Sequence, residues 1–137
     1  MARALGITDA VTTCDCCGKS GLKRTVCMEL DGGDLVHYGT TCATRNTGKP
    51  RAVIASEVRQ AEAQRLTAAR TEWRAHPAHA AERARFLERD QHAKATGVRM
   101  FGPVAMEFVE AAVSAADEAC RAVALRHGVA YWAIRNV

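Results

Sequence analysis

Five of the six cysteines of this chain lie between residues 14 and 42, and this cluster constrains the fold more than any other feature. Cys14, Cys16 and Cys17 open the cluster, Cys42 closes it, and Cys120 stands far away. In a compartment where thiols stay reduced, such a cluster indicates a metal site or redox chemistry before it indicates disulfides.

The cysteine spacing predicts a bound metal ion. Cys14 and Cys17 form a C-x-x-C pair that is followed directly by Gly18. Two thiolates at this spacing can hold one tetrahedral ion when the chain turns tightly between them, and glycine permits the positive φ of such a turn. Cys42 supplies a third thiolate. We therefore predict a zinc ion, with an iron–sulfur cluster as the less favoured alternative.

A tetrahedral zinc site needs a fourth ligand, and the sequence leaves its identity open among His37, Cys27 and Cys16. We favour His37 because it is close in sequence to Cys42 and because imidazole is an ordinary zinc ligand. Cys27 is the next choice, and Cys16 is treated as the spare thiol of the first pair.

Between the two parts of the cluster, the sequence predicts a β-hairpin. Apolar and polar residues alternate over residues 22–30, and a second short alternating run covers residues 35–38. The Asp-Gly-Gly-Asp stretch between them is a strong turn signal. Pairing of Leu30 with Leu35 would place Met28 opposite His37. Before the cluster, β-branched residues predict a short strand within residues 8–13.

After the hairpin, Gly39-Thr40-Thr41-Cys42 predicts a helix start with a threonine as N-cap, and Gly48 ends the helix. The order of knuckle, hairpin and helix with a ligand in its first turn resembles a treble-clef zinc finger. Residues 14–46 resemble in particular the small zinc-finger proteins of actinobacterial phages and their hosts, in which C-x-x-C-G-K and G-x-x-C-A recur. The resemblance implies a zinc module and a phage-encoded protein. Glycine at position 39 departs from the four-cysteine pattern.

The rest of the chain predicts three helices. Residues 51–76 contain no internal glycine or proline, Pro77 starts a second helix that Gly97 ends, and Pro103 starts a third helix that stops at Gly128. We expect Phe86 and Leu87 to anchor the second helix. The third is apolar over most of its circumference, which indicates the centre of a core or an interface.

The predicted fold class is α+β, with a treble-clef-like zinc module in residues 1–50 and a three-helix bundle in residues 51–137. The first residues lack the apolar core of a signal peptide, and no run is long enough to span a bilayer, so we expect a cytoplasmic protein that binds no membrane. Tyr131 and Trp132 are large groups near the end of the chain, and we expect them to dock on the bundle or on a partner.

The formal charge of +4 permits a nucleic-acid partner. The leading prediction is a non-enzymatic regulatory protein that binds nucleic acid or a nucleoprotein target. Its phosphate contacts would be the basic residues around the zinc module, namely Lys19, Lys23, Arg24, Arg45 and Lys49. The alternative is a protein-interaction module, a host-factor inhibitor or a homodimer, that acts through its helices with zinc purely structural. No adjacent catalytic histidines lie in the module, so we predict no enzyme activity.

Overall fold

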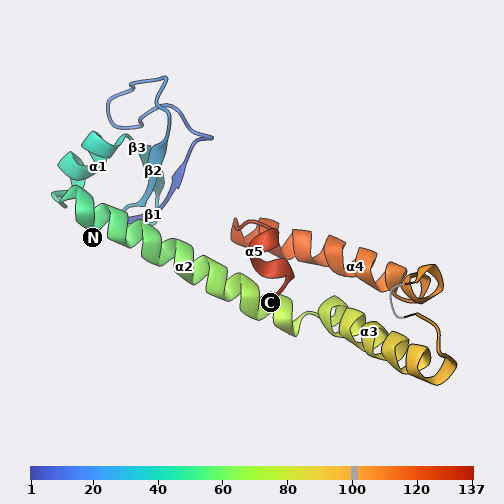
Figure 1. The fold of residues 1–137 in the computed structure, drawn as a ribbon. Helices are drawn as coiled ribbons and strands as arrows, with labels where there is room; N and C mark the ends of the chain where they lie inside the picture. Colours follow the sequence, from blue (N-terminus) through green and yellow to red (C-terminus); the bar gives the residue numbers. More distant parts are fainter. Residues whose placement is uncertain (100–101) are drawn as a thin grey trace. The chain divides into compact units, whose positions relative to one another are not determined.

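The computed structural model describes residues 1–99 and 102–137, which form two compact units, Met1–Gln64 and Arg65–Val137 (Figure 1). Each unit has its own buried core, and the long helix α2, Arg51–Ala75, contributes to both. Among the described residues, the strands lie in the first unit and form one small antiparallel sheet, while most of the chain is helical. The predicted α+β class is therefore confirmed at this level.

The sheet of the first unit has the order β1-β2-β3. Strands β2, Thr25–Glu29, and β3, Leu35–Tyr38, form the predicted hairpin. Strand β1, Arg3–Thr8, pairs antiparallel with β2 on its other edge. The strand expected within residues 8–13 therefore lies upstream of its predicted place, because the alternation of residues 3–8 pairs with β2 and buries Ala4 against the core.

The register of the hairpin differs by one residue from the predicted one. Leu35 pairs with Glu29 rather than with Leu30, so His37 lies opposite Cys27. The reason is the turn, in which the Leu30 N–H donates to the Asp34 carbonyl at 2.9 Å and Gly33 adopts a φ of 86°. A loop that closes at this pair, with glycine in the left-handed region, has three residues rather than the four that we assumed.

Helix α1, Thr40–Thr47, follows the hairpin and ends at Gly48, whose φ is 67°. Its N-cap is Gly39, with no side-chain cap, so the predicted threonine cap was wrong by one residue. The first core gathers the inner face of the sheet, one residue of α1 and the first turns of α2, which are Ala4, Val26, Met28, Ala43, Ile54 and Val58. Because α2 begins by packing on the sheet, the two units divide inside this helix, whereas the sequence suggested a boundary at residue 50.

The second unit contains α3, Pro77–Thr96, α4, Pro103–His127, and the short α5, Trp132–Arg135. Both predicted proline starts are confirmed, and Gly97 and Gly128 cap α3 and α4 in the left-handed conformation, as expected. Helix α3 packs along α4. The end of α2, α4 and α5 share the second core, whose members are Ala69, Trp73, Ala116, Cys120, Val123, Ala124 and Ile134.

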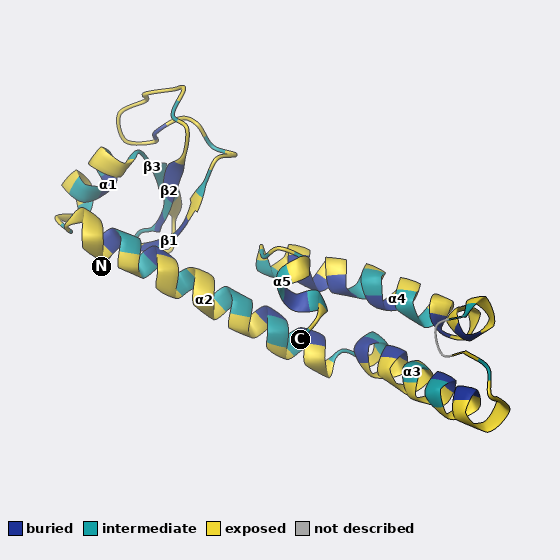
Figure 2. Cartoon of the chain, in the orientation of Figure 1, coloured by how far each residue is buried: buried dark blue, intermediate teal, exposed yellow. Residues whose placement is uncertain are grey.

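The outer faces of α3 and α4 differ from the sequence-based expectation (Figure 2). Leu87 is 60% exposed and Phe86 is only half-buried, so neither anchors α3. The buried residues of α3 are instead His79, Glu82, Arg89 and Ala93, because polar side chains there find partners. Helix α4 also exposes apolar side chains, among them Val104 and Phe108. In the described part of the chain, no helix is both long and apolar enough to cross a membrane.

Candidate metal centre

The thiol cluster is built by a tight turn and by the start of α1. The Gly18 N–H donates to the Cys14 carbonyl at 2.8 Å, and Gly18 adopts a φ of 69°. The Cys14 N–H donates to the Lys19 carbonyl at 2.9 Å, which closes the turn. Cys42 lies in the first turn of α1 and faces this turn. The predicted knuckle therefore has the backbone that a two-thiolate grip on one ion requires.

Cys14, Cys17 and Cys42 bring their sulfur atoms within 4.8 Å of one another. In a tetrahedral zinc site with Zn–S bonds of about 2.3 Å, neighbouring sulfurs lie about 3.8 Å apart, so a small contraction brings these three onto one ion. Thiolates suit zinc and other soft divalent ions. Cys14 is buried, and none of the six cysteines forms a disulfide. The residues present therefore fit a metal ion.

The surroundings of the cluster prepare one thiol for metal binding. Burial alone would raise the pKa of Cys14, but the backbone N–H groups of Gly39, Cys17 and Cys16 donate to its sulfur and lower that pKa to about 7. The Gly39 nitrogen lies 3.2 Å from the sulfur. Hydrogen bonds with the neighbouring thiols, first Cys17, raise the pKa of Cys42 to about 12. A metal ion that binds here displaces the thiol protons.

Cys16 lies at the edge of the cluster. Its sulfur accepts a hydrogen bond from Asn46 Nδ2 at 3.0 Å, and it lies outside the three-cysteine group of the described residues. The same amide nitrogen donates to the Cys42 carbonyl at 2.9 Å, one turn earlier in α1. Sequence reasoning missed Asn46, although its place four residues after a predicted metal ligand on a predicted helix was a usable signal.

The structure does not bring His37 into the three-cysteine group of the described residues. Its ring Nδ1 lies 3.8 Å from Asp15 Oδ2, and its backbone N–H donates to the same carboxylate at 2.6 Å. Cys27 lies opposite His37 on β2 and is also outside the group. These contacts tie the end of β3 to the knuckle through Asp15, so His37 has a structural role that needs no metal.

The predicted phosphate-binding residues fall into two sets. Lys19 and Arg45 line an open hollow of about 330 Å³ beside the three cysteines, and Lys23 and Arg24 are exposed on the approach to β2. Lys49 is instead largely buried, with its ammonium 2.5 Å from Glu57 Oε1 and 2.7 Å from the Ala2 carbonyl. Its charge is neutralised inside the first unit.

The chain was compared with protein-family models, with curated proteins and with solved structures, and none of them matches. The resemblance to phage zinc-finger proteins therefore stays a prediction. So do the phage origin, the cytoplasmic location and the absence of catalysis.

Proposed function

We propose that the first unit is a treble-clef-like module held together by zinc, and that the protein uses it in a non-enzymatic regulatory role to bind the phosphate backbone of nucleic acid. The zinc assignment is supported by the three converging thiols and by the small core of this unit. Small units of this size commonly need a metal to supply part of their folding free energy.

The treble-clef assignment is supported by the order of the elements. A knuckle carries Cys14 and Cys17, the β2–β3 hairpin follows, and α1 presents Cys42 in its first turn. The added strand β1 and the first turns of α2 cover the sheet and enlarge the core. Zinc in this arrangement clamps the hairpin to α1 and has a structural role.

The observation that carries the nucleic-acid proposal is a set of unpaired cations next to the metal centre. Lys19, Lys23, Arg24 and Arg45 are all exposed, and none of them pairs with a carboxylate within the described ranges 1–99 and 102–137. Lys49 and Arg135, by contrast, have acidic partners. A group of unpaired cations is suited to phosphate oxygens, and such binding weakens as salt displaces it.

Fluorescence anisotropy with labelled duplex DNA and single-stranded RNA, titrated with salt, tests this function. We expect affinity to fall steeply with salt and to drop further in the double variant Lys23→Glu/Arg24→Glu. Arg83→Glu is the matched control, because Arg83 is an exposed arginine of α3 in the other unit. If the zinc-loaded protein bound neither nucleic acid at low salt, the proposed function would be refuted.

A second function, protein interaction through the helices, is favoured by exposed apolar side chains in the second unit. Trp132 is 77% exposed, and Val104, Met106 and Phe108 are exposed along α4. Tyr131 is half-buried, and its hydroxyl donates to Asp117 Oδ1 at 2.6 Å, so of the two predicted aromatic contacts Trp132 is the accessible one. Sedimentation velocity over a range of concentrations tests for a homodimer, and Trp132→Ser would weaken it.

A further inference from the structure

Asn46 connects Cys16 to the residue that carries the third thiol. Its side-chain nitrogen donates both to the Cys16 sulfur, at 3.0 Å, and to the Cys42 carbonyl, at 2.9 Å. Because Asn46 and Cys42 are neighbours on one face of α1, the amide is held in place by its own helix. The Cys16 sulfur therefore lies beside α1, the helix that carries Cys42 of the three-cysteine group.

We infer that Cys16 is the fourth thiolate of the metal centre and that Asn46 is the residue that positions its sulfur. The inference rests on the proposed zinc site and replaces His37 as the fourth ligand. A coordinated thiolate keeps lone pairs that accept hydrogen bonds from neighbouring amides, and such outer partners orient ligands and tune metal affinity. The Asn46 amide donates to Cys16 in this way, as the Gly39 N–H does to Cys14.

The competing ligand is held elsewhere. The backbone N–H of His37 and the Asp15 carboxylate lie 2.6 Å apart, the Asp15 N–H donates to the His37 carbonyl at 2.8 Å, and the ring lies 3.8 Å from the same carboxylate. These contacts hold the backbone of His37 to the knuckle through Asp15, and His37 lies outside the three-cysteine group of the described residues. The Cys16 side chain is exposed, and its sulfur already accepts the Asn46 amide beside α1.

The charges around the centre agree with an all-thiolate site. Zinc with four thiolates carries a net negative charge, which an open hollow beside it exposes to solvent. Lys19 and Arg45 line that hollow and reduce the charge at close range. A site with three thiolates and a neutral imidazole would carry one negative charge fewer, so it would need fewer cations nearby.

Spectroscopy of the full chain loaded with Co²⁺ tests the ligand set, because the near-ultraviolet charge-transfer absorption of cobalt grows with the number of thiolate ligands. We expect Cys16→Ala to remove about a quarter of that intensity, since one of four thiolates is lost. His37→Ala and Cys27→Ala, the matched controls, keep the full intensity. The opposite pattern, with intensity retained in Cys16→Ala and the cobalt spectrum altered in His37→Ala, would overturn the inference.

Two further measurements do not depend on the folding of Cys16→Ala. Cadmium NMR of the unmodified protein separates a site of four sulfurs from one of three sulfurs and a nitrogen, and a mixed-ligand signal would refute Cys16 as a ligand. Asn46→Ala should weaken zinc binding about 10- to 100-fold while the cobalt intensity stays unchanged, as expected for an outer-shell partner. Unchanged zinc affinity would refute the role of Asn46. A four-sulfur site in a protein that fails to bind nucleic acid would leave this inference intact and refute the proposed function.

Discussion

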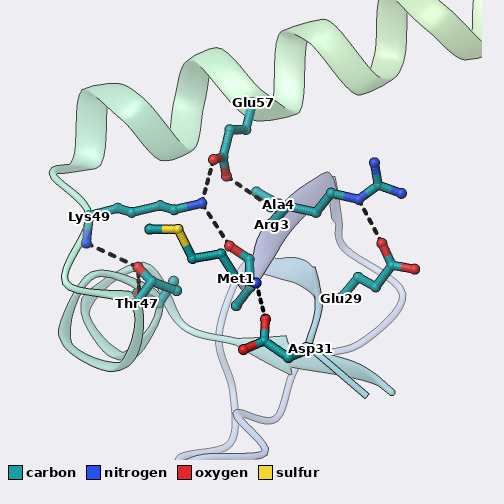
Figure 3. A network of polar contacts seen from close by, with 10 residues as sticks. Met1, Arg3, Ala4, Glu29, Asp31, Thr47, Lys49 and Glu57 are labelled. Carbon is teal, nitrogen blue, oxygen red and sulfur yellow. Dashed lines mark hydrogen bonds and ion pairs between the residues drawn. The ribbon is translucent and has the colours of Figure 1, made fainter. Parts of the chain in front are cut away.

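The Lys49 ammonium lies 2.5 Å from Glu57 Oε1, and this ion pair joins the segment after α1 to the first turns of α2 (Figure 3). The other carboxylate oxygen of Glu57 accepts the Ala4 N–H at 3.0 Å, and Lys49 also donates to the Ala2 carbonyl. Two charged side chains thus tie β1, α1 and α2 together. A residue predicted to contact phosphate serves the fold of the first unit.

We expect Lys49→Met to lower the free energy of unfolding by about 2 kcal/mol, because it removes hydrogen bonds from a charged donor and leaves the Glu57 carboxylate without its cation. Urea denaturation of the zinc-loaded chain measures the change. Lys23→Met is the control, since Lys23 is exposed and pairs with no described carboxylate, and its stability should stay within about 0.5 kcal/mol. Equal effects of the two substitutions would contradict the structural role of Lys49.

The Glu57 carboxylate makes the stability of the first unit depend on pH. Burial would raise the pKa of Glu57, but the hydrogen bonds from Lys49 and from the Ala4 N–H lower it below its ordinary value of 4.5. A carboxyl whose folded pKa is depressed contributes stability above its unfolded pKa, and that contribution is lost as the pH falls through the folded value. We therefore expect Glu57→Gln to flatten the loss of stability below pH 4.5, measured by unfolding at several pH values. If Glu57→Gln lost stability below pH 4.5 as steeply as the unmodified protein, that result would contradict the ion pair.

Metal removal should unfold the two units to different extents. A strong chelator is expected to broaden the amide signals of Val26 and Ala43, whose core depends on the clamped hairpin, while those of Ala116 and Val123 persist. Two-dimensional amide NMR measures both sets in one sample. Chelator saturated with zinc beforehand is the control and should leave the spectrum unchanged. Loss of both sets together would show that the units fold as one.

Arg135 is the central charge of the second unit. Its guanidinium donates to Glu82 at 2.5 and 3.0 Å and to Asp117 at 2.6 Å, and Glu82 is buried. Arg135→Leu would leave a buried carboxylate without a cation, so we expect a loss of about 3 kcal/mol in the free energy of unfolding. Arg126→Leu breaks an exposed pair with Glu72 and should cost at most about 1 kcal/mol. Thermal unfolding measures both, and a larger effect at Arg126 would refute this ranking.

The two tryptophans should behave in opposite ways. Trp73 is fully buried in the core that also contains Cys120 and Ile134, whereas Trp132 is 77% exposed. We expect Trp73→Ala to destabilise the protein by about 3–5 kcal/mol and Trp132→Ser to change its stability by less than about 0.5 kcal/mol. Acrylamide should quench the fluorescence of Trp132→Phe only weakly, because the remaining tryptophan, Trp73, is buried. Strong protection of Trp132 in the unmodified protein at high concentration would instead indicate self-association.

The sequence predicted most helix boundaries correctly because they depend on local backbone chemistry. Pro77 and Pro103 suit the first helical position, and Gly48, Gly97 and Gly128 accept the left-handed conformation that ends a helix. The hairpin was found for the same reason, although its register was missed. The three-residue turn that Leu30 and Asp34 close accompanies a register in which every cross-strand pair is shifted by one position from the predicted one.

The sequence by itself determined that thiols would gather near residues 14–42, because a C-x-x-C knuckle and a helix start impose local geometry on Cys14, Cys17 and Cys42. Only the tertiary structure decided which other side chains surround them. Asn46 donates a hydrogen bond to the Cys16 sulfur, and the Asp15 carboxylate accepts the backbone N–H of His37. The tertiary structure also decided that Lys49 forms an ion pair with Glu57 and that Trp132 is exposed. The physical reason is that these outcomes depend on contacts between distant segments, which spacing along the chain does not encode.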